Sequence, residues 1–333
     1  MFESILPCEN KEKYQSFCFR NYVPIYSKPW WMDALCGPEN WNVWLYVKGN
    51  DILAAMPFYF EERNGYKYIT KAPLTQNNGI IFPEIEGQKI VTAQRFQEEV
   101  INAACDFISL CDVDVYEQQY QPSFIYWLPF FWKYYTAITR FTYTIEDTSN
   151  IQAVWENVSS KYRAKIKKGA KNTILKSGLE PTAFYQEHEK IFLKQGLPCP
   201  FSADLWSRLF SACSRNNACQ ILYRVTENEE IASLMFLVWD ERRMYQLLAG
   251  SIPEHQNLDS YDALIWDGIQ LAHEKGLMYD FEGSVIPRIS KSFREFGGTP
   301  ERYYRIRKVF NPDILLQEYQ AEANRLQRER AIN

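Results

Sequence analysis

Two carboxylates stand close together in a short apolar segment near the end of the sequence. Asp280 and Glu282 interrupt the run 278–282, which otherwise has the composition of a buried strand. Side chains alternate along a strand, so the two carboxylates would share one face, roughly 7 Å apart. Such a pair in a partly dry cleft should raise one of the two pKa values, which suits a general base. Glu282, at the strand end, is the better-placed base.

The residues that follow suggest both a chemical and a structural use for this pair. Arg288 and Arg294 come shortly after Glu282, and either arginine could pair with it and hold the corner in place. Tyr303 or Tyr304 could protonate a leaving group, although either could equally be an ordinary strand aromatic. Glycines mark tight backbone turns on the way: Gly283, before Ser284, and Gly297 with Gly298.

A cationic segment opens the second half of the chain. It is predicted to be a helix capped by Ser159 or Ser160, with Tyr162, Ile166 and Ala170 as a buried stripe. The remaining face is basic and carries Lys161, Arg163, Lys165, Lys167, Lys168 and Lys171. Like charges repel along a helix, so this density favours an anion site for a nucleotide phosphate or an RNA backbone. Arg163 has the planar fork that suits phosphate. The alternative is a solvated helix face.

Periodicity places these residues on alternating strands and helices in two halves. The first half is predicted to hold a helix at 30–36, strands at 41–47, 53–60 and 66–69, a helix at 92–110, and strands at 113–116 and 141–145. The second half repeats that order with strands at 221–225, 231–239 and 244–250, a helix at 260–275, and strands at 278–282 and 303–309. The shared order indicates a structural duplication, with a linker at 146–150.

The last segment is predicted to be a helix that packs on the body. Asn311 suits an N-cap and Pro312 the first helical position. Leu316, Tyr319, Ala323 and Leu326 form an apolar stripe at helical spacing, with partner binding as the alternative.

Bulk composition points to an enzyme of the cytoplasm with two domains. The chain has 333 residues, a net charge of −4 and 46% hydrophobic residues, so a sizeable core is available. The N-terminus lacks a signal-peptide pattern, and no stretch reaches the ~20 apolar residues of a membrane span. The richest run, 124–135, is broken by Pro129 and Lys133. Eight cysteines are interpreted as reduced core thiols, and three histidines argue against a zinc site.

Several of these pieces together resemble the GNAT superfamily, specifically its Fem-like branch. They are Tyr26-Ser27-Lys28-Pro29-Trp30-Trp31, the basic segment 161–168, the helix 260–275, and the run 280–284 with 293–298 and Tyr304. The resemblance implies an α+β (mixed α/β) fold of tandem GNAT-like domains, each a mixed sheet flanked by helices. The expected limits are 1–148 for the first domain, 149–310 for the acyltransferase domain and 311–333 for the C-terminal helix.

The resemblance also implies transfer of an acyl group onto an amine. The donor is acyl-CoA in the broad superfamily and aminoacyl-tRNA in the enzymes that build peptidoglycan bridges. A backbone N–H near Leu248 or Ala249, where two strands of such a sheet separate, would hold the oxyanion. Lys28 and Arg163 would hold a phosphorylated acceptor, and the polar loop 71–79 could line the acceptor side.

The segment before the helix 260–275 departs from the CoA-binding pattern. Residues 251–260 contain no glycine, and Glu254 and Asp259 would oppose a pyrophosphate, although Ser260 could cap a helix that binds an anion. The first hypothesis, which follows the superfamily resemblance, is an N-acyltransferase without a metal that uses acyl-CoA and a small-molecule or nucleotide- or lipid-linked amine of an envelope precursor. Transfer from tRNA, a binding protein without catalysis, and a nucleic-acid binder are the alternatives.

Overall fold

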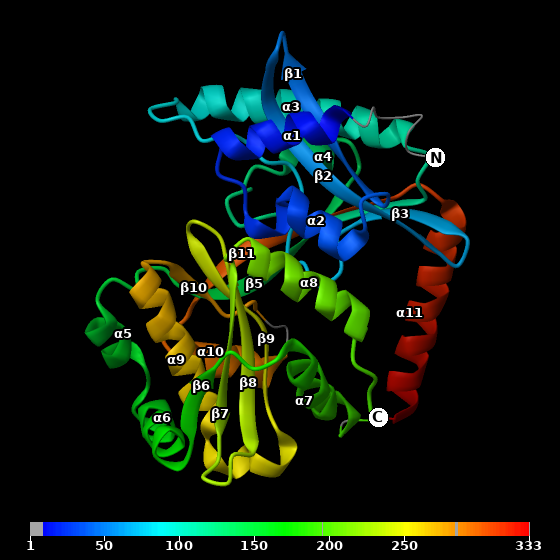
Figure 1. Ribbon diagram of the computed structural model, residues 1–333. Helices are drawn as coiled ribbons and strands as arrows, with labels where there is room; N and C mark the ends of the chain where they lie inside the picture. Colours follow the sequence, from blue (N-terminus) through cyan, green and yellow to red (C-terminus); the bar gives the residue numbers. More distant parts are fainter. Residues whose placement is uncertain (1–8, 195, 284–285, 333) are drawn as a thin grey trace. The chain divides into compact units, whose positions relative to one another are not determined.

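The computed structural model describes residues 9–194, 196–283 and 286–332, and its contacts divide the chain into two units. Unit 1 comprises Met1–Met32, Cys36–Thr139 and Tyr303–Asn333, and unit 2 comprises Asp33–Leu35 and Arg140–Arg302. Each unit is a mixed sheet with helices (Figure 1).

Unit 1 is a sheet in the order β1-β2-β3-β4-β11. Its core lies between this sheet and the long helix α3, and consists largely of aromatic and branched side chains. The elements are α1 (Glu9–Arg20), η2 (Ile25–Ser27), α2 (Pro29–Cys36), β1 (Trp41–Lys48), β2 (Asp51–Arg63), β3 (Tyr66–Thr70), α3 (Ile90–Leu110), β4 (Val115–Gln119), α4 (Leu128–Trp132), β11 (Thr299–Val309) and α11 (Pro312–Ile332). The β2–β3 hairpin turns at Asn64 and Gly65, both with positive φ, as their sequence predicts.

Unit 2 is a sheet in the order β5-β10-β9-β8-β7-β6. Its helix α9 covers one face of the sheet and α7 and α8 contact the other, because alternate residues of β8 point to opposite sides (Figure 1). The elements are β5 (Thr136–Ile145), α5 (Ile151–Asn157), α6 (Ser160–Asn172), β6 (Ile174–Ser177), α7 (Pro181–Leu193), α8 (Ala203–Arg215), β7 (Cys219–Val225), β8 (Ile231–Trp239), β9 (Arg243–Ser251), η3 (Pro253–Leu258), α9 (Ser260–Lys275), β10 (Met278–Asp280) and α10 (Pro287–Glu295).

The strand that ends each half of the sequence pairs in the other unit. In β5, Thr144 and Ile145 pair with β10, and in β11 the residues from Arg305 to Val309 pair with β4. The contact units therefore differ from the consecutive division expected at 148/149 and 310/311, which stays a prediction. Local periodicity identifies such strands but carries no information about their partners.

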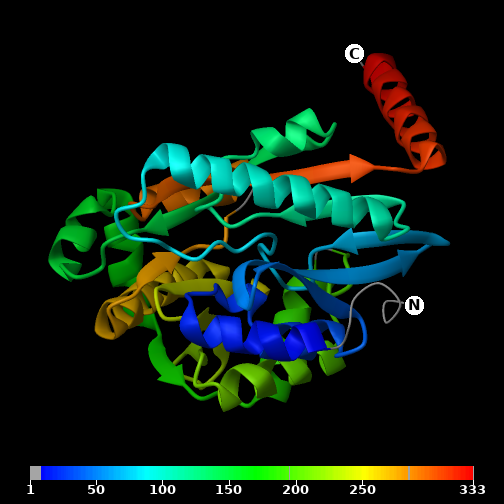
Figure 2. The same cartoon turned by 90° about the horizontal axis from the view of Figure 1, so that it is seen from above.

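Most strands and long helices predicted from periodicity are confirmed within a few residues, as are the caps at Ser159 and Asn311. The predicted packing of the C-terminal helix is wrong. Leu316 and Tyr319 are exposed on α11, and of the residues 312–329 only Ile314 is buried. Figure 2 shows this helix projecting from the rest of unit 1. Its stripe is short and interrupted by Ala323, so little apolar surface is available for burial.

The described cysteines are all free thiols, of which Cys36, Cys105, Cys111 and Cys213 are buried, and Cys8 lies outside the described residues. No helix within 9–194, 196–283 and 286–332 is long and apolar enough to cross a membrane.

Helices α6 and α9 approach each other closely at Gly169. A Cβ at this position would lie 2.2 Å from the carbonyl oxygen of Asp259, which no real contact allows. The buried stripe of α6 therefore consists of Ile166 and Gly169, whereas Ala170, predicted to belong to it, is exposed. The predicted stripe is confirmed at Ile166 and at half-buried Tyr162, whose ring packs against Phe296. It is wrong at Ala170, because a glycine in a cationic helix shows no hydrophobic signal.

We expect Gly169→Ala to destabilise unit 2, because the added methyl group must push the start of α9 away. The free energy of unfolding in urea should fall by about 1–3 kcal/mol. Ala164→Leu adds more bulk to the same helix at an exposed position and should leave stability nearly unchanged. Equal effects of the two substitutions would show that the close approach at Gly169 does not matter.

Candidate active site

The sheet of unit 2 opens between β9 and β10. The two strands are parallel and pair only where Met278, Tyr279 and Asp280 face the first three residues of β9. Beyond this point the N–H of Phe281 donates to the carbonyl of Tyr143 at 2.9 Å, so the chain follows β5 and leaves β9. On that side, β9 continues from Gln246 to Ser251 without a strand partner among the described residues. The predicted separation of these strands is confirmed.

A β-bulge lies at the same place on the other side of β9. Phe236 of β8 faces Leu248 and Leu237 faces Gln246, so Leu247 has no counterpart in β8. Bulges turn backbone groups out of the regular ladder and are frequent beside active sites. Leu248 and Ala249, the predicted oxyanion segment, follow the bulge directly. A one-residue insertion is invisible in the alternation of such an apolar strand, so the sequence contained no sign of it.

Asp280 is a completely buried carboxylate that accepts three hydrogen bonds. Its Oδ1 accepts the hydroxyl of Thr142 and, at 2.8 Å, the backbone N–H of Glu282. Its Oδ2 accepts Nη1 of Arg243 at 2.8 Å, and the same guanidinium makes two bonds to Glu301. Burial raises the pKa of Asp280 while Arg243 opposes that rise. With its oxygens occupied in this way, Asp280 is suited to positioning the chain after β10.

Glu282 lies just past the end of β10 in a left-handed backbone conformation, with φ of 66°. The prediction that it shares a strand face with Asp280 is therefore wrong: the strand ends at Asp280, and the backbone turn removes the alternation. Left-handed conformations cost free energy in residues other than glycine and concentrate at functional sites. Burial raises the pKa of Glu282 well above its usual range, as a general base requires.

The glycine after Glu282 explains how the chain makes this turn. Gly283 has φ of 65°, and a Cβ there would lie 2.4 Å from the carbonyl oxygen of Phe141 on β5. The prediction of a tight turn at Gly283 is confirmed, as it is at Gly297 with φ of 84°. Ser284, the other half of the predicted corner, lies outside the described residues.

The raised pKa of Glu282 makes a prediction about stability. The folded protein holds the Glu282 proton to higher pH than the unfolded chain does, so the free energy of unfolding falls as pH rises through the folded pKa. Glu282→Gln removes this fall, and the variant should be more stable than wild type above that pKa. Urea unfolding of both proteins over a pH series measures the difference. Parallel curves at all pH values would contradict the buried state of this carboxyl.

Sequence reasoning missed a polar network at the point where the strands separate. Gln246 is buried on β9, accepts the hydroxyl of Tyr279 at 2.7 Å and donates to the hydroxyl of Tyr261 at 3.0 Å. It thereby ties β9, β10 and α9 together where pairing ends. A lone glutamine in an apolar strand was the available signal, because a buried amide requires partners. Arg243 gave a similar signal at the start of the same strand.

The start of α9 differs from the predicted cap. Asp259, with φ of 56°, is the N-cap and its side chain makes no capping bond, while Ser260 is the first helical residue. Ser260 is buried, and its hydroxyl has no hydrogen-bond partner among the described residues. The capping prediction is wrong because Asp259 precedes Ser260 and takes the cap position.

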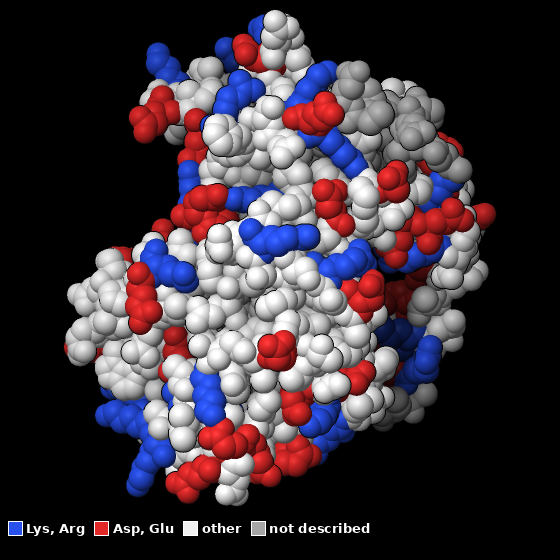
Figure 3. Space-filling view, viewed as in Figure 1, with Lys and Arg blue, Asp and Glu red and all other residues white. Residues whose placement is uncertain are grey.

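The basic helix α6 uses several of its cations within unit 2. Lys165 bonds to Asp262 at 3.1 Å, and Lys168 bonds to Asp259 at 2.7 Å and to the carbonyl of Asn257 at 2.9 Å. These lysines offset the carboxylates at the start of α9. Blue lysine side chains and red carboxylates accordingly lie together over the place of α6 in Figure 3.

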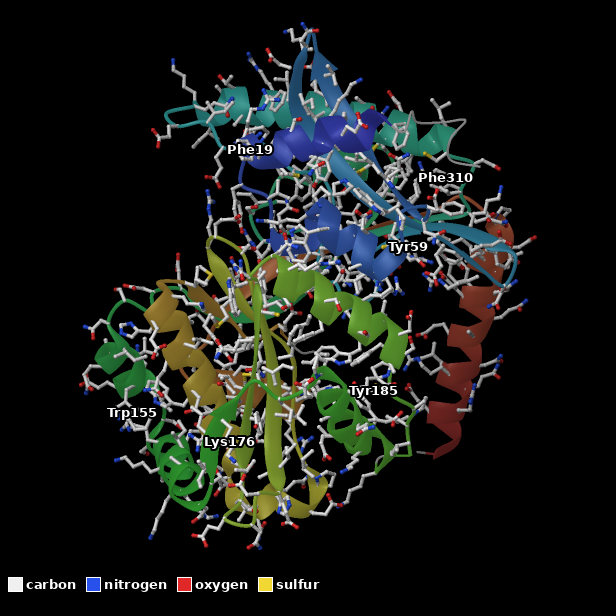
Figure 4. The ribbon with its side chains drawn as sticks, viewed as in Figure 1. Phe19, Tyr59, Trp155, Lys176, Tyr185 and Phe310 are labelled. Atoms are coloured by element: carbon white, nitrogen blue, oxygen red, sulfur yellow. The ribbon has the colours of Figure 1, made fainter. Side chains whose placement is uncertain are left out.

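Arg163 closes the end of α5. Its Nη1 donates to the carbonyls of Trp155, Glu156 and Val158, the closest at 2.7 Å, and thus satisfies the last groups of that helix. Trp155, labelled in Figure 4, lies 5.9 Å below the ammonium of Lys167. Arg163 therefore stabilises the end of α5, whereas the side chain of Lys167 is exposed to solvent.

The remaining predicted site residues, Arg288, Arg294 and Tyr303, lie on α10 and β11. Arg288 and Arg294 are exposed on α10, and the hydroxyl of Tyr143 on β5 meets Ser290 of that helix at 2.6 Å. Tyr303 is buried on β11 in unit 1, which suits a core aromatic better than a proton donor.

Lys28 and the polar loop 71–79 come together in unit 1. Lys28 follows η2, in which the carbonyl of Tyr26 accepts a hydrogen bond from the side-chain amide of Asn78 at 2.8 Å. The indole of Trp31 donates to Thr75 at 2.9 Å. The structure thus brings together two segments that were predicted separately as the acceptor side.

Comparison with known proteins now places the fold. Residues 156–287 match the family model described as an acetyltransferase (GNAT) domain. The comparison with curated proteins finds no match to the chain. Among solved structures, the chain is similar to FemX, with a TM-score of 0.68 and 9% identity, covering 92% of this chain and 98% of FemX.

Two further structures share the fold at low identity. A tandem GNAT protein from the clavulanic acid biosynthesis pathway has a TM-score of 0.52 and 9% identity, over 91% of this chain and 95% of its own. L-PGS from Bacillus licheniformis has a TM-score of 0.53 and 12% identity, over 95% of each chain.

The protein is therefore a transferase with the tandem GNAT fold, and its unit 2 contains the acetyltransferase-type domain. Residues 156–287 are the part of the chain that matches the acetyltransferase (GNAT) model, and the fold of the chain is similar to that of FemX. The expected α+β class with tandem mixed sheets and a C-terminal helix is confirmed.

Proposed function

We propose that the protein is a cytoplasmic N-acyltransferase that moves an acyl group from acyl-CoA to an amine on a small-molecule or a nucleotide- or lipid-linked envelope precursor. The observation that carries the proposal is the separation of β9 from β10, with the bulge at Leu247 and Glu282 at the end of β10. It provides, in one unit, backbone donors outside a ladder and a carboxyl group with a raised pKa.

In this proposal Glu282 removes the proton from the attacking ammonium group, which must be neutral to act as a nucleophile. A backbone N–H at Leu248 or Ala249 stabilises the negative charge that develops on the carbonyl oxygen. Asp280 and Arg243 position Glu282 through its backbone N–H and do not touch the reacting atoms. Lys28 and the loop 71–79 are proposed for the acceptor side, on their proximity within unit 1.

A second candidate, aminoacyl-tRNA as the donor, is favoured by the start of α9. A CoA pyrophosphate needs accessible N–H groups at such a helix start. Here Ser260 is buried, Gly169 of α6 lies against Asp259, and Asp259 and Asp262 add negative charge. Lys165 and Lys168 offset that charge only in part, because each is also exposed to screening by solvent.

A donor panel distinguishes these candidates. Purified protein is incubated with acetyl-CoA, longer acyl-CoAs or charged tRNA, each with amino sugars, nucleotide-linked amino sugars and peptide amines, and products are identified by mass spectrometry. Transfer from a CoA thioester supports the first candidate, and transfer only from charged tRNA supports the second. Glu274→Gln, an exposed change on α9, is the matched control for Glu282→Gln.

No transfer from any donor at high enzyme concentration would count against catalysis. Calorimetric titration with CoA would then test the remaining alternative, a GNAT-fold binding protein without activity. A nucleic-acid binder would instead bind RNA with steep salt dependence and lose it on charge reversal at Lys167 and Lys168.

A further inference from the structure

Unit 1 exposes a cluster of large apolar side chains on and around the short helix α4. We name Ile125, Leu128, Phe131, Trp132 and Tyr134 the α4 patch. Their exposed fractions are 61, 44, 58, 52 and 88%, respectively. In Figure 2, α4 projects at the upper edge of unit 1, beyond α3. A concentration of exposed aromatic residues of this kind marks an interaction surface more often than scattered single residues do.

The other side of the same segment is firmly anchored, so the exposure does not reflect a loose loop. Phe130 and Tyr135 are buried in the core, with ring centroids 5.1 Å apart, and both contact Tyr116 of β4. At the end of the helix, Nζ of Lys308 donates to the carbonyl of Lys133 at 2.9 Å. Leu128, Phe131 and Trp132 are spaced three and four residues apart and share the outward face of the helix.

The segment of sequence that contains the α4 patch carries only positive charges. Residues 118–145 contain no aspartate or glutamate, and Lys133 and Arg140 are their only charged residues. Lys308 adds a third cation beside Lys133. Asp106 on α3 approaches Lys133 at 3.4 Å, but both side chains are largely exposed, so this pair is weak. The surface therefore suits an occupant that is apolar in its interior and anionic at its edge.

A lipid surface has this chemistry. Tryptophan and tyrosine favour the boundary between headgroups and acyl chains, and leucine, isoleucine and phenylalanine enter the acyl region. Lysines beside them are attracted to anionic headgroups. The helix is too short to span a bilayer and could only lie in its surface. From the exposed α4 patch and its cationic border, we infer that unit 1 docks on anionic lipid membranes through α4.

This inference concerns unit 1 alone and does not depend on the proposed transfer reaction. It is tested by flotation of the full chain with vesicles of phosphatidylcholine alone or mixed with phosphatidylglycerol. The wild type should float with the mixed vesicles and bind pure phosphatidylcholine more weakly. A triple variant, Phe131→Ser, Trp132→Ser and Tyr134→Ser, should lose affinity on the order of tenfold or more, because apolar insertion is removed.

The control changes an exposed aromatic elsewhere in unit 1. Phe19 on α1 is 92% exposed and labelled in Figure 4, so Phe19→Ser removes one exposed aromatic side chain away from α4 and should leave vesicle binding unchanged. Lys133→Glu should weaken binding to the mixed vesicles most at low salt. Thermal unfolding of each variant verifies that the fold is retained.

Three outcomes would overturn the inference. The first is a wild type that binds neither vesicle. The second is an equal loss of binding in Phe19→Ser, which would mean that the affinity does not come from α4. The third is a dimer in light scattering that the triple variant converts to monomer while vesicle binding is unaffected, which would assign the patch to a second copy of this chain.

Discussion

Glu282→Gln should lower kcat roughly 10²- to 10⁴-fold while the affinity for the amine acceptor changes little. Glutamine keeps the size of the side chain but cannot accept the proton of the attacking ammonium group. The loss should therefore appear in the chemical step. Steady-state rates with saturating donor and acceptor measure it, with Glu274→Gln as the control that changes a carboxylate of the same unit at an exposed position.

The pH profile separates a base from a residue that only supports the fold. Glu282 works when deprotonated, and burial raises its pKa, so the wild-type rate should rise with pH through that raised value. In Glu282→Gln this limb should disappear, leaving a low rate that follows only the ionisation of the acceptor amine. A variant that keeps the wild-type profile and rate would exclude Glu282 as the base and leave its left-handed backbone to be explained by the turn alone.

Arg243→Met should have the largest effect on stability, lowering the free energy of unfolding by about 3–5 kcal/mol. Arg243 is the cation that faces the completely buried carboxylate of Asp280 and also pairs with Glu301. Its removal leaves Asp280 without charge compensation in a site that water does not reach. Urea denaturation at neutral pH measures the loss.

The double variant Arg243→Met, Asp280→Asn tests this reason. It removes the buried charge together with its partner, so it should be more stable than Arg243→Met alone. Arg288→Met, an exposed change on α10, should be close to wild type. If the double variant is no more stable than Arg243→Met, the loss arises from packing of the arginine stem and not from the uncompensated carboxylate.

The candidate site was only partly predictable. The position of the opening, between the strands that contain Leu248 and Asp280, was predicted and is confirmed. The different roles of Asp280 and Glu282 were not predicted. They follow from the end of β10 and the left-handed turn, which depend on the close approach of Gly283 to β5. Thr142, which bonds to Asp280, lies far away in the sequence and shows no local signal.

The cationic helix illustrates the same limit. Its helical form and its cap at Ser159 follow from local residues and are confirmed. The partners of its charged side chains do not follow from local residues. Arg163 bonds to the end of α5, and Lys165 and Lys168 pair with aspartates at the start of α9. A run of lysines in a sequence does not show whether the side chains bind a phosphate or pair with carboxylates of the same protein.

The sequence by itself determined where strands, helices and turns form, because period, caps and glycines act over a few residues. The order of its motifs also predicted a GNAT-type fold, in agreement with the family model that residues 156–287 match. Only the tertiary structure decided which strands pair, including the pairing of β5 with β10 and of β11 with β4. It also decided that β9 bulges at Leu247, where β10 separates from it. These features depend on hydrogen bonds and burial between residues far apart in the chain, and no local pattern encodes them.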